Sequence, residues 1–149
     1  MPALVLVAGI AAFAATRLGG SNPAPAPKVA PVDPASVHVA RLFLATAVAR
    51  KNLAAAYDIV APNLKEGMSL AEWKRGTIPV VPYPTAEAKA QLRALSSLTD
   101  SVLFQVTFTP RVGSSAKPGV YQLSERKLDG RWLVDGWTAK SSIGASSSK

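Results

Sequence analysis

Side chains that could perform acid–base chemistry are few in this chain of 149 residues. Asp58 is the only acid in the apolar segment 53–60, where it follows Tyr57. A carboxylate surrounded by apolar side chains loses hydration, so its pKa rises and it can act as a general base. Asp135 is the second candidate base, because it lies close to two tryptophans. Solvent exposure is the simpler interpretation of both acids.

Other catalytic patterns are missing from the sequence. The chain has one histidine, His38, and no cysteine, so it lacks a histidine pair, a thiolate nucleophile and a disulfide framework. His38 falls beside an apolar helical stripe, where a surface position is the simpler interpretation. There is no glycine-rich phosphate loop, no Gly-x-Ser-x-Gly nucleophile motif and no cluster with metal-ligand spacing. We therefore assign no catalytic residue, no cofactor and no metal.

Aromatic and acidic side chains on the predicted helices and strands are the candidates to line a ligand pocket. They are Tyr57, Asp58, Trp73, Phe104, Trp132 and Asp135. Strict alternation along the last strand would place Trp132 on one face and Trp137 on the other. One tryptophan could then line a pocket, although packing of both in a small core is the simpler interpretation.

The charge of the chain favours anionic partners. Lys and Arg number 17 against 9 Asp and Glu, which gives a formal net charge of +8. The basic residues are spread along the chain and form no run longer than a pair. A nucleic-acid interface usually concentrates its charge, so we expect no nucleic-acid partner and favour a protein or an anionic envelope polymer.

The N-terminal third divides into segments of distinct composition. Residues 1–18 hold an unbroken apolar run from Ala3 to Ala15, and we favour a membrane anchor there over a cleaved signal peptide or a buried helix. Residues 19–33 carry four prolines and predict an extended tether. The folded domain is expected at 34–140, followed by a Ser-rich disordered tail at 141–149. The anchor would hold the body on the extracytoplasmic side of the membrane.

Helix signals come first in the body. Asp33 and Pro34 fit an N-cap and first helical position, and apolar residues at spacings of three and four predict a helix over 34–50. A second apolar segment, 53–60, predicts a helix that ends before Pro62, because the residue ahead of a proline avoids the α region. Ser69 begins a capping box that predicts a short helix as far as Gly76.

Strand signals follow. Residues 77–83 are β-prone but contain two prolines, which predicts an edge strand or an extended loop. Segment 87–94 has a helical composition but alternates strictly, and we favour a strand. Segment 102–109 alternates clearly, and Asp129-Gly130 predicts a tight turn between strands 120–128 and 131–138. Helices followed by strands predict an α+β fold with three helices and an antiparallel sheet of four or more strands.

This order of elements resembles the nuclear transport factor 2-like superfamily, and so does the close of the chain, Asp129-Gly130-Arg131-Trp132 followed by Val134 and Trp137. The resemblance covers about 105 residues, and the anchor and tether make the chain similar to small membrane-anchored proteins of actinobacterial type. It implies a cone, in which helices close over a curved sheet, and a homodimer through that sheet. Because the superfamily contains both enzymes and binding modules, it does not fix the function.

Two functions remain open on the sequence. The first is a membrane-tethered extracytoplasmic accessory domain without catalytic activity, which binds a protein partner, an envelope polymer or an apolar ligand. The second is a small-molecule isomerase, dehydratase or hydrolase that uses Asp58 or Asp135 as its base. The second requires one of these carboxylates to face a closed apolar pocket.

Overall fold

The computed structural model describes residues 28–141 of the chain. The predicted anchor at 1–18, most of the predicted tether and residues 142–149 lie outside the described residues. The helical elements are α2 (Pro34–Phe43), the π-helix η1 (Leu44–Val48), α3 (Leu53–Asp58), α4 (Pro62–Lys65), α5 (Leu70–Lys74) and the 3-10 helix η2 (Thr85–Glu87). The strands are β1 (Ala88–Ser97), β2 (Ser101–Pro110), β3 (Gly119–Leu128) and β4 (Arg131–Ser141). None of the helices in this range is long and apolar enough to span a membrane.

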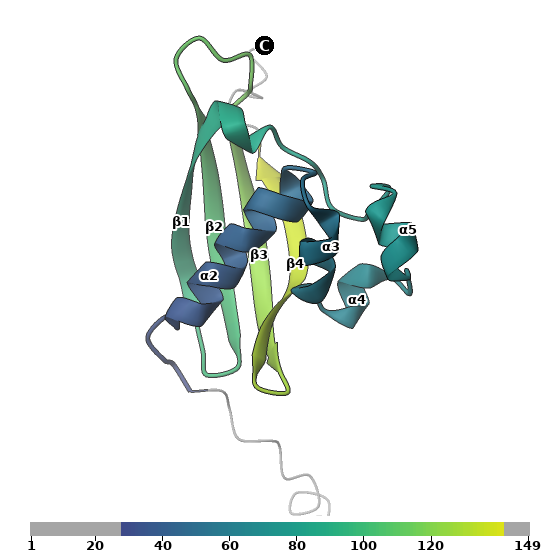
Figure 1. Cartoon of the computed structure of the whole chain (residues 1–149). Coiled ribbons are helices and arrows are strands. Elements are labelled where there is room, and N and C mark those ends of the chain that lie inside the picture. Colours follow the sequence, from purple (N-terminus) through teal and green to yellow (C-terminus); the bar gives the residue numbers. More distant parts are fainter. Residues whose placement is uncertain (1–27, 142–149) are drawn as a thin grey trace, which may run out of the picture.

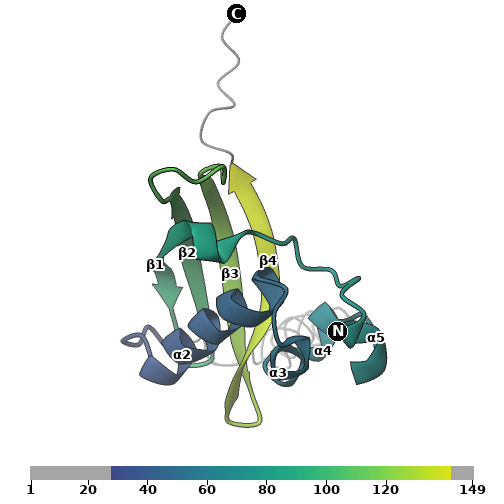
Figure 2. The ribbon, with the colours of Figure 1, turned by 45° about the horizontal axis from the view of Figure 1, so that its top comes forward.

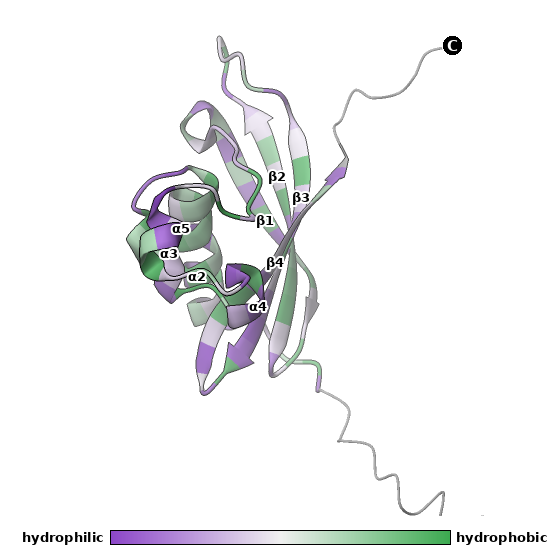
Figure 3. Ribbon diagram, turned by 90° about the vertical axis from the view of Figure 1, so that its right-hand side faces the viewer, coloured by the Kyte–Doolittle hydropathy of each residue, from purple (hydrophilic) through white to green (hydrophobic). Residues whose placement is uncertain are grey.

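The strands form one antiparallel sheet in the order β1-β2-β3-β4, with helices on one face (Figure 1). α2 runs across the strands, whereas α3, α4 and α5 gather beside β4 (Figure 2). Among residues 28–141, no helix lies on the other face of the sheet (Figure 3). The α+β class and the four-stranded antiparallel sheet predicted from the sequence are therefore confirmed.

The first helix begins as predicted and changes its winding. The Asp33 carboxylate accepts a hydrogen bond from the Ala35 amide, and Pro34 occupies the first turn. From Leu44 the chain widens into a π-helix, in which the Ala49 amide donates to the Leu44 carbonyl at 3.1 Å. The regular helix expected over 34–50 is thus wrong in its last part. The Thr46 hydroxyl donates a hydrogen bond to the Leu42 carbonyl, which belongs to the preceding turn of the helix.

The second helix ends earlier than the sequence predicts. α3 stops at Asp58 because the chain next pairs with β4, where Val60 forms a parallel bridge to Val134. The Val134 amide donates to the Ile59 carbonyl at 2.8 Å, and the Ala61 amide donates to the Val134 carbonyl at 2.8 Å. This long-range pairing competes with the helical hydrogen bonds. The short turn α4, which follows it, was not predicted.

Two further predictions on this part of the chain have clear outcomes. The capping box at Ser69 is confirmed, since its hydroxyl accepts from the Glu72 amide and the Glu72 carboxylate accepts from the Ser69 amide. Residues 77–83 form no strand and connect α5 to η2 as a loop, which agrees with the second of the two alternatives, an extended loop. The Tyr83 amide ends this loop by donating to the Val48 carbonyl at 3.0 Å.

The strands predicted at 87–94, 102–109, 120–128 and 131–138 are present, but bulges change the faces that the side chains occupy. The turn has positive φ at Asp129 (51°) and Gly130 (77°), as a type I′ hairpin requires. In β4, Val134 pairs with Glu125 and Gly136 pairs with Ser124, so Asp135 is an extra residue. The expected separation of Trp132 from Trp137 is therefore wrong. The bulge returns Trp137 to the helix-facing side, where both tryptophans are buried.

The described chain enters and leaves the sheet at opposite ends. At the β1–β2 turn, the Ala30 amide donates to the Ser97 carbonyl and the Thr99 amide donates to the Lys28 carbonyl, both at 3.0 Å. Residues 28–30 of the predicted tether are thus hydrogen-bonded to the sheet. β4 ends at the far side, beside the loop that enters β3 (Figure 1).

Candidate functional site

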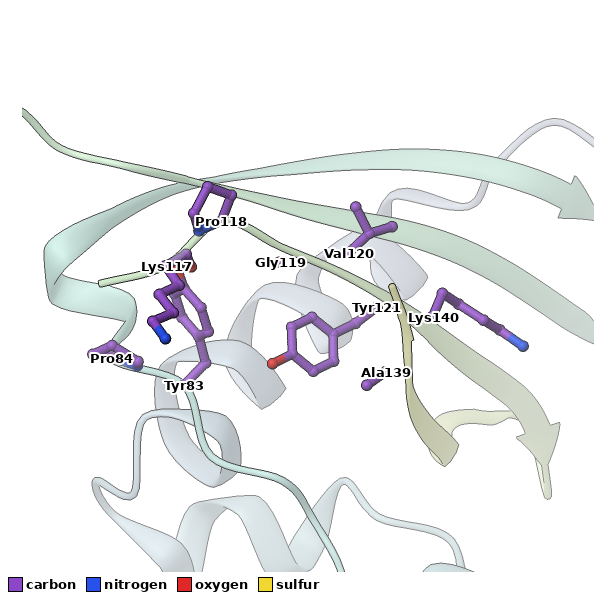
Figure 4. Close-up of a pocket in the computed structure, with 9 residues that line it drawn as sticks. All are labelled: Tyr83, Pro84, Lys117, Pro118, Gly119, Val120, Tyr121, Ala139 and Lys140. Atoms are coloured by element: carbon purple, nitrogen blue, oxygen red, sulfur yellow. Dashed lines mark hydrogen bonds between the residues drawn. The ribbon is translucent and has the colours of Figure 1, made fainter. Parts of the chain in front are cut away.

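A pocket of about 500 Å³ lies where β3 begins and β4 ends, and we call it the strand-end pocket. Its walls come from the loop before η2, the loop entering β3 and the last residues of β4 (Figure 4). The lining residues are Tyr83, Pro84, Lys117, Pro118, Gly119, Val120, Tyr121, Ala139 and Lys140. The volume lies in the range of small-molecule sites, roughly 300–1,000 Å³.

Stacked aromatic rings support this pocket from the core. Tyr83 stacks on Phe108 with ring centroids 4.0 Å apart, and Tyr121 stacks on Trp137 at 4.5 Å. The two tyrosine rings stand 6.2 Å apart and 75° to one another. The Trp137 indole donates to the Val81 carbonyl at 3.0 Å, which fixes the ring beneath Tyr121. The tyrosines are therefore held in position by buried rings behind them.

The hydroxyl of Tyr83 has a structural partner. It donates to the Lys117 carbonyl at 2.6 Å and so fastens the loop entering β3 to the loop before η2. Burial is the main cause that raises the pKa of Tyr83, and the nearby Tyr121 and Glu87 add to the effect. Tyr83 is consequently a neutral hydrogen-bond donor that shapes the wall of the pocket.

A glycine and a β-bulge next to Tyr121 position its ring at the floor of the strand-end pocket. A Cβ atom at Gly119 would lie 2.9 Å from Cε2 of Tyr121, closer than side chains pack, so glycine lets the ring lie against the strand. Tyr121 pairs with Ala139 and Val120 pairs with Ser141, which leaves Lys140 as a second bulge residue in β4. Both features turn the strand ends around the ring.

The polar groups of the pocket are unevenly placed. The Tyr121 hydroxyl lies on the side of Tyr83 and Lys117, whereas the Lys140 ammonium extends the opposite way (Figure 4). Within residues 28–141, the Tyr121 hydroxyl makes no hydrogen bond and the Lys117 ammonium makes no ion pair. One side of the pocket thus offers a hydroxyl and a cation.

The helical candidates from the sequence lie elsewhere. Tyr57 and Trp73 come together with ring centroids 5.9 Å apart, in the contact between α3 and α5. The Tyr57 hydroxyl donates to the Met68 carbonyl at 2.9 Å, and Lys65 lies over the Tyr57 ring. Asp58 is exposed, as is His38. Tyr57 and Trp73 therefore join two helices, and none of these side chains lines the strand-end pocket.

The strand candidates are also outside the strand-end pocket. Phe104 is a core residue, and the Trp132 indole donates to the Asp33 carboxylate at 2.9 Å, which ties β4 to the start of α2. Asp135 pairs with Arg126 at 3.4 Å, and the bulge directs its side chain away from the helix-facing side. Neither Asp58 nor Asp135 faces the pocket, so neither has the setting that a general base requires.

The sequence candidates did not include Glu125, the one buried carboxylate in the described chain. It is 1% exposed and accepts a hydrogen bond from the Ser36 hydroxyl at 2.6 Å, while its Oε1 has no partner. Burial raises its pKa to about 7; the Ser36 hydrogen bond opposes this rise and the Asp135 charge adds to it. Alternation along β3 places Glu125 on the same face as Leu123, a signal that could have found it. Glu125 does not line the strand-end pocket.

Metal-ligand geometry is not found in the part of the chain that the structure describes, where no three His, Cys, Asp or Glu side chains gather. No family model, no curated protein and no solved structure matches the chain. The strand-end pocket, with its two tyrosines and two lysines, is the candidate site.

Proposed function

We propose that this protein is a membrane-tethered binding domain that works on the extracytoplasmic side without catalysis. The observation that carries the proposal is the aromatic pocket at the end of the sheet opposite to the point where residue 28 enters. If residues 1–18 anchor the chain in a membrane, the sheet separates the pocket from the attached end. A pocket placed there is accessible to a ligand arriving from outside the membrane.

The lining supports an apolar ligand among the partners that a domain of this kind could bind. Pro84, Pro118, Val120 and Ala139 surround the two tyrosines, and such surfaces favour apolar contact over catalysis. Helices on one face of a four-stranded antiparallel sheet are compatible with a nuclear transport factor 2-like domain, and we retain this assignment as part of the proposal. An isomerase, dehydratase or hydrolase is not favoured, because no carboxylate lines the pocket.

Cell fractionation with protease treatment of intact cells tests the proposal. The full chain is expected in the membrane fraction, and external protease should degrade it. A matched variant that begins at residue 19 lacks the apolar segment and should leave the membrane fraction. Full-length protein found soluble and protected inside the cell would overturn the proposed location.

Native mass spectrometry tests the binding role. Protein purified from membranes is expected to carry a small molecule, and Ala139→Trp should remove it by filling the pocket. A bound molecule that is retained by Ala139→Trp would show that this pocket is not the binding site. Ala139 is exposed, so we expect the variant to fold, and circular dichroism checks this.

A further inference from the structure

We propose that the strand-end pocket takes a small amphipathic carboxylate, with the acid at Lys117 and Tyr121 and the apolar body against the tyrosine rings. This inference rests on the binding function proposed above and names the chemistry of the ligand. Three observations support it: the volume of the pocket, the separation of its lining into apolar and polar sides, and the Lys117 and Tyr121 donors on the polar side.

The apolar part of the ligand is set by shape. A volume of about 500 Å³ holds one or two rings with a short side chain. Tyr83 and Tyr121 stand at 75° to one another, so a flat group resting on one ring presents its edge to the other. Pro118 and Val120 complete the apolar surface. A compact ring system therefore fits better than a long flexible chain.

The charged part of the ligand is set by the donors. Within the described residues, Lys117 has no ion-pair partner and the Tyr121 hydroxyl no hydrogen-bond partner, and Figure 4 draws that hydroxyl toward the Lys117 side. The Tyr83 hydroxyl is already used by the Lys117 carbonyl. A carboxylate has two oxygens that accept hydrogen bonds, so one can accept from the Lys117 ammonium and the other from the Tyr121 hydroxyl.

Neighbouring charges do not cancel this preference. Glu87, on the adjacent η2, is an opposing negative charge, since it contributes, after burial, to the raised pKa of Tyr83, and its carboxylate accepts a hydrogen bond from the Ser114 hydroxyl at 3.0 Å. Lys140 adds a second positive charge at the rim of the pocket. The net charge of +8 also attracts anions to the whole molecule. Two lysines in the lining against one neighbouring acid therefore favour an acidic ligand over an amine.

The test uses the full-length protein and 3-phenylpropionate, with the neutral 3-phenylpropanamide and the cationic 3-phenylpropylamine as matched probes. Binding is followed through the three Trp indole N–H signals in NMR spectra, because only Trp137 supports the pocket. The acid should shift the Trp137 signal and bind about tenfold more tightly than the amide, as expected for one charge-assisted contact. The amine should bind more weakly than the amide.

Variants separate the two donors. Lys117→Met should reduce the affinity for the acid to that for the amide, and Tyr121→Phe should reduce it severalfold while it keeps the stacked ring. Lys89→Met, on the open sheet face, is the matched control and should leave the affinity unchanged. Acid and amide that bind equally at Trp137 would overturn this inference and leave the binding function intact. If none of the three probes moves the Trp137 signal, the inference fails, and the native mass spectrometry result then decides the binding function separately.

Discussion

At the scale of single residues, the structure distinguishes buried acid from exposed acid. Asp58 and Asp135 have the sequence surroundings of a base, yet one is exposed and the other pairs with Arg126. Glu125 is buried between α2 and the sheet, with a single hydrogen bond from Ser36. Burial of Glu125 affects the stability of the folded protein, because a buried carboxylate without a countercharge is less stable in its ionised form.

Glu125 should make the folded protein less stable as the pH rises. The native pKa is about 7 against 4.5 for the free group, so the native state binds the proton more tightly. The stabilisation is fully present below pH 4.5 and is lost as the pH rises through 7, by about 3 kcal/mol. Glu125→Gln should remove this dependence and be the more stable protein at pH 8. Denaturant unfolding at pH 5 and pH 8 measures it.

Glu66→Gln is the control for this pH series, since Glu66 is exposed and the change in charge is the same. It should follow the wild type at both pH values. If Glu125→Gln also loses stability between pH 5 and pH 8 as the wild type does, another group causes the dependence.

At the scale of elements, turns and bulges determine which side chains meet. The turn after β3 needs positive φ at both central residues, and the bulge at Asp135 returns Trp137 to the core. The bulge at Lys140 and the small residue at Gly119 bring the strand ends around Tyr121. Substitutions of Gly130 in the turn and Gly136 in β4 test how the β3–β4 hairpin is held.

Gly130→Ala should lower the free energy of unfolding by about 1–2 kcal/mol, because an L-residue is strained at φ 77°. No atom lies within 4 Å of the added methyl group, so the loss would report backbone strain alone. Asp129→Asn is the matched control and should be neutral, since Asn-Gly suits the same turn. Thermal or denaturant unfolding gives both values. An unchanged stability in Gly130→Ala would show that the turn adopts another form.

Gly136→Ala should be destabilising for a different reason. The added Cβ would overlap the Ser124 hydroxyl across the β3–β4 pair, so the hydroxyl must leave its present rotamer, at a cost of about 1 kcal/mol. Ser124→Ala removes that oxygen, and its remaining Cβ lies 3.7 Å from the new methyl group. The double variant should therefore recover most of the loss, as a double-mutant cycle of unfolding energies will show. Additive losses would contradict the cross-strand contact.

At the scale of the whole molecule, the two ends of the sheet have different roles. Residues 28–30 are hydrogen-bonded to the β1–β2 turn, and the strand-end pocket is lined by the start of β3 and the end of β4. Figure 1 shows that these strand ends lie at the end of the sheet opposite to the β1–β2 turn. In the part of the chain that the structure describes, the helices cover one face of the sheet and the other face has no helical layer (Figure 3). The proposed location outside a membrane uses this polarity, since attachment at one end leaves the other accessible.

A chain that begins at residue 31 should be less stable than one that begins at residue 28. It loses two backbone hydrogen bonds at the β1–β2 turn, worth about 1–2 kcal/mol together. Val29 is 88% exposed, so little apolar burial is lost with it. Denaturant unfolding of the two chains measures the difference. Equal stability would show that residues 28–30 do not contribute to the fold.

Local signals in the sequence determined most of the secondary structure. The Asp33-Pro34 cap, the capping box at Ser69 and the Asp129-Gly130 turn depend on neighbouring residues, and each is present. Alternation in 87–94 predicted the structure better than composition did, because residues 88–94 pair with β2, whereas Glu87 ends η2. The α+β class follows from the order of these elements.

Only the tertiary structure decided which residues share a surface. The early end of α3 follows from pairing with β4, and the positions of Trp137 and Asp135 follow from a bulge that shifts the alternation by one residue. Tyr83, Lys117, Tyr121 and Ala139 come from three separated segments, and no local spacing connects them. Local propensity acts over a few residues, whereas a pocket is built from contacts between strands and loops that are distant in the chain. For that reason the sequence alone could propose the fold class but could not locate this pocket.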